Sequence, residues 1–431
     1  MSRQIWFIML AAISVGAQDM SLTSGKDLGD AVANRSAPFV DLLRQAEAGN
    51  KYAQYAVADA YATGNGVPKN DAEEMRWLLQ AAQSGFAEAQ NRLGYLYRQG
   101  IGVSQDYGEA ARWFGKAAEQ KFPVAQYNLA GMYQSGEGMQ LDYARAADLY
   151  AQAAAQGLAP AQNSLGAAYE HGRGVLRNVD EAFRLFHQAA EQGEPAAQHN
   201  LGLMYFEGEG TARNYPEALK WFSRAADGGV LEAYHGLGRM YESGNGVGRD
   251  PAKAAGLFRK AAEHGLATAQ IELAALYMAG KGVQQDYLEA AKWVGRAAAQ
   301  GHPVAENALG FLYFRGEGVR RDYRQAAYWL QKAADQNNAQ AQENLGFLYE
   351  NGLGVPLNYG EAYKWFRLAA DGGITASERA LMALKQVMTV AQIRDGQTRA
   401  SDWISHYKNV KLATEKIEAR EPESLAAATQ P

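Results

Sequence analysis

Apolar residues recur along this chain at helical spacing, and the whole pattern repeats every 36 residues. In one unit, Ala89, Leu93, Leu96 and Tyr97 fall on one face of a helix when each residue turns by about 100°. Gly94 lies beside them, and every other unit has Gly or Ala at the equivalent position. A small residue there lets a second helix come close. The pattern therefore predicts an amphipathic first helix, helix A, in each of nine units.

A second apolar stripe in each unit predicts a second helix, helix B. Its start is marked by Asp or Asn in all nine units, followed three residues later by Glu or Gln in seven, as in Asp106 and Glu109. This spacing is a capping box, in which both side chains accept backbone N–H groups of the first turn. In the same unit the buried face comprises Ala110, Trp113, Phe114, Ala117 and Ala118.

Between the two helices every unit carries a pair of glycines. The first glycine is expected to end helix A in the left-handed conformation, and the second to bend the loop towards helix B. A phosphate-binding loop is excluded, because no Lys-Ser or Lys-Thr follows and no strand precedes the glycines. The pairs are Gly64/Gly66, Gly100/Gly102, Gly136/Gly138, Gly172/Gly174, Gly208/Gly210, Gly244/Gly246, Gly280/Gly282, Gly316/Gly318 and Gly352/Gly354.

The combined pattern, Ala-x-x-x-Leu-Gly-x-x-Tyr-x-x-Gly-x-Gly-Val and then Ala-x-x-Trp-Phe-x-x-Ala-Ala-x-x-Gly, resembles the Sel1-like repeat, a relative of the tetratricopeptide repeat. The resemblance covers residues 38–405. It implies an all-α fold, a right-handed α/α superhelical solenoid of nine 36-residue helix–turn–helix repeats with capping helices. It also implies adaptor or scaffold work in protein complexes.

The N-terminus has the features of an export signal. Arg3 precedes an apolar stretch, Ile5 to Val15, and Val15-Gly16-Ala17 forms a small-residue cleavage site. The apolar stretch is shorter than the roughly 20 residues that span a bilayer, so the mature chain is expected to have no transmembrane segment. An uncleaved anchor is the alternative. The sequence thus predicts an exported protein, periplasmic or secreted after cleavage.

These patterns divide the chain into six segments. The predicted segments are a signal peptide (1–17), a flexible leader (18–37), an N-terminal capping helix (38–49), nine repeats (50–373), C-terminal capping helices (374–409) and a disordered tail (410–431).

Candidate chemistry is sparse, and no catalytic residue, metal ligand or cofactor is predicted. The formal charge of −5 and the lack of basic runs argue against nucleic acid as a partner. Cysteine is absent. His199 and His235 share one position in adjacent repeats, but no third ligand accompanies them, so we interpret them as surface histidines. Ser405 and Lys408 match Ser-x-x-Lys without its companion motifs.

The positions that vary between repeats indicate a working surface. Helix-A positions equivalent to Asn91, Tyr95 and Arg98 are expected to point away from the core; we call this surface the helix-A face. In helical-hairpin solenoids helix A usually lines the concave side. Charged residues at the same positions favour a partner site over padding between successive A helices. The predicted partner-binding residues are Leu203, Phe206, Arg239, Ile271, Met278, Phe311, Phe314 and Phe347.

The functional prediction is a non-enzymatic exported scaffold that binds a peptide or helical segment of a protein partner through this concave face. The resemblance suggests cell-envelope assembly or polysaccharide export. One alternative is a periplasmic regulator that restrains a membrane sensor kinase, and another is a β-lactam or peptidoglycan hydrolase, for which the sequence offers no catalytic dyad. The sequence does not decide between a monomer and an oligomer.

Overall fold

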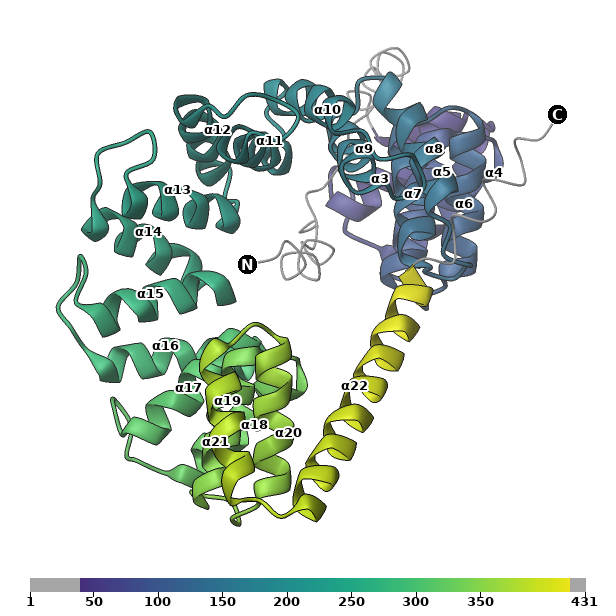
Figure 1. The fold of residues 1–431 in the computed structure, drawn as a ribbon. Coiled ribbons are helices and arrows are strands. Elements are labelled where there is room, and N and C mark those ends of the chain that lie inside the picture. Colours follow the sequence, from purple (N-terminus) through teal and green to yellow (C-terminus); the bar gives the residue numbers. More distant parts are fainter. Residues whose placement is uncertain (1–38, 419–431) are drawn as a thin grey trace. The chain divides into compact units, whose positions relative to one another are not determined.

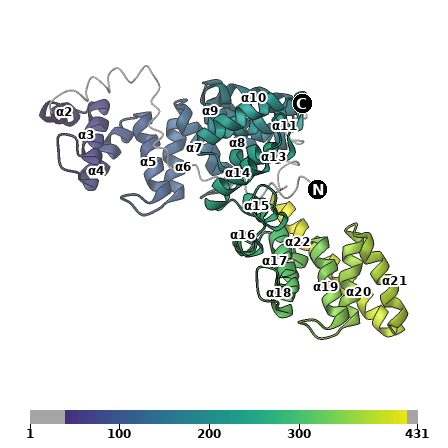
Figure 2. The ribbon, with the colours of Figure 1, turned by 90° about the vertical axis from the view of Figure 1, so that its left-hand side faces the viewer.

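The computed structural model describes residues 39–418, which form α-helices and contain no strand. The chain divides into two compact units between Asn178 and Val179, inside the fourth repeat. Unit 1 includes α2–α9, and unit 2 includes α10–α22. Figure 2 shows α17–α21 of unit 2 side by side in sequence order, as expected for stacked repeats. This arrangement confirms the prediction of an all-α solenoid.

Each repeat contributes two helices of 13 residues. The A helices are α3 (Lys51–Thr63), α5 (Ala87–Gln99), α7 (Pro123–Ser135), α9 (Ala159–His171), α11 (Pro195–Glu207), α13 (Leu231–Ser243), α15 (Ala267–Ala279), α17 (Pro303–Arg315) and α19 (Ala339–Asn351). The B helices are α4 (Asp71–Gln83), α6 (Tyr107–Glu119), α8 (Tyr143–Ala155), α10 (Val179–Glu191), α12 (Tyr215–Asp227), α14 (Pro251–Glu263), α16 (Tyr287–Ala299), α18 (Tyr323–Asp335) and α20 (Tyr359–Asp371).

Small residues on helix A make room for the aromatic residues of helix B. A Cβ atom placed on Gly94 would lie only 2.7 Å from the ring of Phe114, and the same clash would arise between Gly202 and Phe222. Both phenylalanines are fully buried. Burial of a phenyl side chain stabilises the fold by about 1.5–3 kcal/mol. The small residue predicted from the sequence is therefore needed for close packing of the two helices.

The glycine loop is held by a backbone hydrogen bond that recurs in all nine repeats. The N–H of the residue that caps helix B donates to the carbonyl of the invariant tyrosine, as from Asp106 to Tyr97 at 2.9 Å. The Asp106 side chain accepts from the backbone N–H of Glu109 at 3.0 Å, which confirms the predicted cap. The second predicted contact of the capping box, from the Asp106 backbone N–H to the Glu109 carboxylate, was wrong. The Glu109 carboxylate instead pairs with Arg112, because the Asp106 N–H is already bonded to Tyr97.

The two glycines of each loop have different roles. Gly316 caps α17 in the left-handed region, with φ of 74°, as predicted. Gly318 also has a positive φ, and a Cβ atom there would lie 1.8 Å from the carbonyl oxygen of Tyr287, the first residue of the preceding B helix. The second glycine therefore lets each loop approach the preceding repeat. In Figure 1 the loops after α13 and α15 lie along the same edge of unit 2.

A buried glutamine on helix A joins most repeats to their neighbours. The Gln90 side-chain amide donates to the carbonyl of Ala82, at the end of the preceding B helix, at 2.9 Å. Its oxygen accepts from Gln120 at 2.7 Å. The equivalent glutamines Gln162, Gln198, Gln270 and Gln342 also donate to a helix-B carbonyl, and Gln54 donates to the carbonyl of Ala46, ahead of the first repeat. Glu306 occupies this position in the eighth repeat.

Helices outside the repeats flank the array. Helix α2 (Phe39–Glu47) packs against α3, and α21 (Thr375–Val387) packs against α20. Helix α22 (Val390–Glu418) packs along α20, where a Cβ atom on Gly396 would lie 2.7 Å from Tyr363. Helix α22 continues through residues 410–418, most of which are helix-forming residues.

The predicted signal peptide and leader (1–37) and the last part of the predicted tail (419–431) lie outside the described residues. Among the described helices, none combines the length and the apolar character needed to cross a membrane.

Candidate functional site

The eight predicted partner-binding residues all lie on A helices of unit 2, but their exposure differs. Phe311 and Phe347 are exposed, at 44% and 42%. The other six are half-buried and are Leu203, Phe206, Arg239, Ile271, Met278 and Phe314. The helix-A face is therefore a closely packed surface from which two phenyl rings protrude.

The part of this face on α11 and α13 is closed by contacts around Phe206. The Phe206 ring lies 5.5 Å from Tyr215 and 6.4 Å from Phe222, both on helix B of the same repeat. The Arg239 guanidinium covers it from α13, 5.4 Å from the ring centroid. Of these contacts, only the one with Arg239 joins successive A helices.

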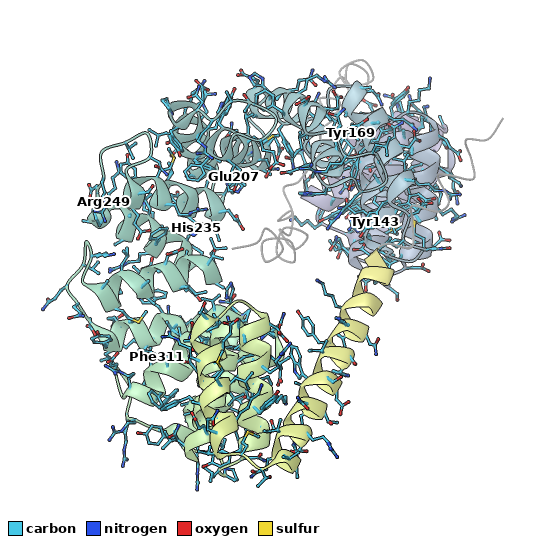
Figure 3. All side chains as sticks on the ribbon, viewed as in Figure 1. Tyr143, Tyr169, Glu207, His235, Arg249 and Phe311 are labelled. Atoms are coloured by element: carbon cyan, nitrogen blue, oxygen red, sulfur yellow. The ribbon has the colours of Figure 1, made fainter. Side chains whose placement is uncertain are left out.

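The surface assignment of His199 and His235 was wrong. Their exposed fractions are only 4% and 3%, and their rings lie against Phe222 and Phe258, at 5.6 and 5.5 Å. Figure 3 shows His235 near the start of α13, with Arg249 in the loop at the other end of that helix. The helical wheel failed because each ring packs against the B helix of its own repeat rather than facing solvent.

Burial of the two histidines also sets their protonation. Desolvation lowers the pKa of His199 to about 4. Desolvation, followed by the positive charge of Arg239 and then by His199, lowers the pKa of His235 to about 3. Both imidazoles are therefore neutral at pH 7.

On α15, Ile271 and Met278 pack against the central core cluster of unit 2. Glu272 is next to Ile271, and its pKa is raised by burial and then by the negative charge of Glu242, while Arg239 opposes the shift. This middle section of the helix-A face therefore combines half-buried apolar groups with interacting charges.

The face is open on α17 and α19. Phe311 and Phe314 lie one turn apart on α17, where Figure 3 labels Phe311. The Phe314 ring packs edge-on against Phe347 of α19, with centroids 5.9 Å apart. No cation covers these rings as Arg239 covers Phe206 among the described residues. Two neighbouring A helices thus present adjacent aromatic side chains to solvent.

The described residues contain no evident catalytic centre. Within them, no three His, Cys, Asp or Glu side chains converge as metal ligands. Ser405 and Lys408 are both exposed on α22, and the Ser405 hydroxyl donates to the carbonyl of Ser401 at 2.9 Å. A cavity in unit 1, next to Tyr150, has a volume of about 40 Å³, and an open hollow of about 630 Å³ lies beside Tyr313 and Arg320 in unit 2. Small-molecule sites usually enclose roughly 300–1,000 Å³ and are lined mostly by apolar side chains, whereas the larger hollow is lined mainly by polar and charged residues.

Comparison with solved structures finds other bacterial repeat proteins. A Sel1 repeat protein from Oxalobacter formigenes is 33% identical, with a TM-score of 0.55 over 74% of this chain and 93% of its own. A protective antigen of uropathogenic Escherichia coli strains, which has an SLR fold, is 29% identical over 88% of this chain and 97% of its own, with a TM-score of 0.43. None of the curated proteins matches the chain.

The family model for the Sel1 repeat matches nine consecutive segments. They are residues 51–86, 87–122, 123–158, 159–194, 195–230, 231–266, 267–302, 303–338 and 339–374. Sel1 repeats generally form non-catalytic scaffolds for protein–protein interaction. The matched segments run without a gap through the predicted array, so the chain belongs to the Sel1-repeat family.

Proposed function

We propose that this protein is an exported, non-enzymatic scaffold that captures a protein partner through the helix-A face of unit 2, in cell-envelope assembly or polysaccharide export. One observation carries the proposal: Phe311 and Phe347 protrude from neighbouring A helices, although most large apolar residues of the repeats are buried. Adjacent exposed aromatic side chains are typical of the centre of a protein interface.

The supporting contacts favour a preformed site. Phe314 packs against the core cluster around α18 and α19 and holds Phe347 from one side. Because packing against Phe314 restrains the Phe347 ring, its binding would cost little conformational entropy. The prediction of export depends on residues 1–17 and belongs to this proposal.

The test is affinity capture from an envelope fraction, comparing the wild-type protein with the Phe311→Ser/Phe347→Ser variant by mass spectrometry. We expect the partner to be lost from the variant, because both substitutions remove apolar contact area. Helicity should be unchanged, since both side chains are exposed.

The matched control is Tyr328→Ser on α18, which removes an aromatic side chain that is 52% exposed on a B helix. This variant should retain the partner. Equal loss with the control, or equal capture by all three proteins, would contradict the proposed site.

A further inference from the structure

The open end of the helix-A face carries uncompensated negative charge. On α19, Glu343 precedes Phe347 by four residues and Glu350 follows it by three, so the two carboxylates flank the ring on one side of the helix. At a rise of about 1.5 Å per residue, they are separated by roughly 10 Å along the axis. Both side chains are half-buried.

Neither carboxylate forms an ion pair with a described residue. Glu343 accepts a hydrogen bond from the amide of Gln340, which is neutral. No hydrogen bond or ion pair to Glu350 is found from residues 39–411, and burial raises its pKa. A half-buried charge without a counter-charge is unfavourable for the isolated protein.

An earlier repeat shows how this position can be neutralised. Arg98 is the equivalent of Glu350 in the second repeat, and it forms a 2.7 Å ion pair with Glu137 in the next repeat's loop. The residue equivalent to Glu137 after the ninth repeat is Thr389, whose backbone N–H and hydroxyl both donate to Gln392. No further repeat follows at this point, so no residue in the described part of the chain supplies an opposite charge to Glu350.

We infer that the partner segment is cationic, and that it places an apolar side chain against Phe311 and Phe347 with lysine or arginine side chains beside Glu343 and Glu350. Charge complementarity across the interface would neutralise both carboxylates and fix the register of the segment. The net charge of −5 would also favour the approach of a basic segment. This inference rests on the proposed function, because it assigns the chemistry of the partner at the same face.

The probe is a phage-displayed library of random 12-residue peptides selected on the full-length protein. We expect enriched peptides to contain an aromatic or aliphatic residue with Lys or Arg within four positions. For one such synthetic peptide, Glu343→Gln/Glu350→Gln should weaken binding about tenfold at low salt and reduce its salt dependence. Glu263→Gln, an exposed carboxylate on α14, is the matched control and should bind as the wild type does.

The outcomes separate this inference from the proposed function. Enriched peptides without a basic bias, or unchanged binding to Glu343→Gln/Glu350→Gln, would overturn the cationic partner. If those peptides were still lost in Phe311→Ser/Phe347→Ser, the proposed binding face would stand. If no peptide depended on Phe311 and Phe347, both ideas would fail. Circular dichroism melting of each variant verifies that the fold is intact.

Discussion

The helix-A face is built differently on α11–α13 and on α17–α19, although the same repeat positions form both regions. In the first region, Phe206 is covered by Arg239, and the histidine pair is buried against helix B. In the second, Phe311 and Phe347 protrude and no described cation covers them. The side chains of the first region are used in contacts within the array, whereas the two rings of the second region are exposed and bind the partner only under our proposal. Phe206 and its equivalent Phe314 are half-buried in both regions, so the regions differ at the position held by Leu203 and Arg239 in one and by Phe311 and Phe347 in the other.

The sharpest test of this difference removes the helix-B ring that lies beneath the first region and one exposed ring of the second. Phe222→Ala should lower the free energy of unfolding by about 3–5 kcal/mol, because the ring is fully buried against His199 and Gly236. Phe311→Ala should change it by less than about 1 kcal/mol, because the ring is already partly hydrated. Urea unfolding followed by circular dichroism measures both. Similar losses would mean that the open region is also structural core.

Acid should destabilise the closed region through its histidines. The pKa of His199 falls from 6.5 to about 4 on folding, so the unfolded chain binds more protons between these values. Stability from His199 is complete above pH 6.5 and is lost as the pH falls towards 4, by an amount on the order of 3 kcal/mol.

The variant His199→Asn/His235→Asn should flatten this part of the stability profile, because asparagine is the natural residue at the same position in other repeats, as at Asn91. Thermal melting from pH 7 to pH 4 tests the expectation. His406→Asn, on the exposed side of α22, is the control and should retain the wild-type slope. A double variant as acid-sensitive as the wild type would refute the role of the buried pair.

The smallest expected effect concerns Glu306 on α17. At the equivalent position, six other repeats have a glutamine that donates to a carbonyl of the preceding helix. Glu306 is buried, and burial raises its pKa although Lys332 and Gln336 oppose the shift. The contribution of Glu306 to the free energy of unfolding is complete below its unfolded-state pKa of 4.5. It is lost as the pH rises through the pKa of Glu306 in the folded protein.

Glu306→Gln should therefore stabilise the protein by about 1 kcal/mol at pH 7, with little gain below pH 4.5. Differential scanning calorimetry at both pH values measures the gain. A variant less stable than the wild type at pH 7 would show that the carboxylate makes a favourable contact of its own.

The sequence predicted the repeat, the helix pair, the left-handed glycine and the helix-B cap, because each depends on contacts inside one 36-residue unit. It missed side-chain contacts between helices, within a repeat and across repeats. Gln90, a polar residue on an otherwise apolar helix, was the detectable sign of a buried bond to Ala82 of the preceding repeat. The burial of His199 and Phe206 could not be inferred, because a helical wheel describes one helix and not its packing against Phe222 of helix B or, for Phe206, against Arg239 of the next repeat.

The second glycine of each loop gives the array a direction. In seven loops, from Gly138 to Gly354, this residue contacts the first turn of the B helix of the preceding repeat. Each loop thus leans backwards along the chain. When the last repeat unfolds, its loop is lost, but the B helix of the preceding repeat, on which that loop rested, stays folded. When the first repeat unfolds, its B helix is lost, and the loop of the following repeat then has nothing to rest on. Local unfolding that starts at the N-terminal end of a unit therefore spreads inwards more readily than unfolding that starts at its C-terminal end. Helix α22 strengthens the C-terminal end of unit 2.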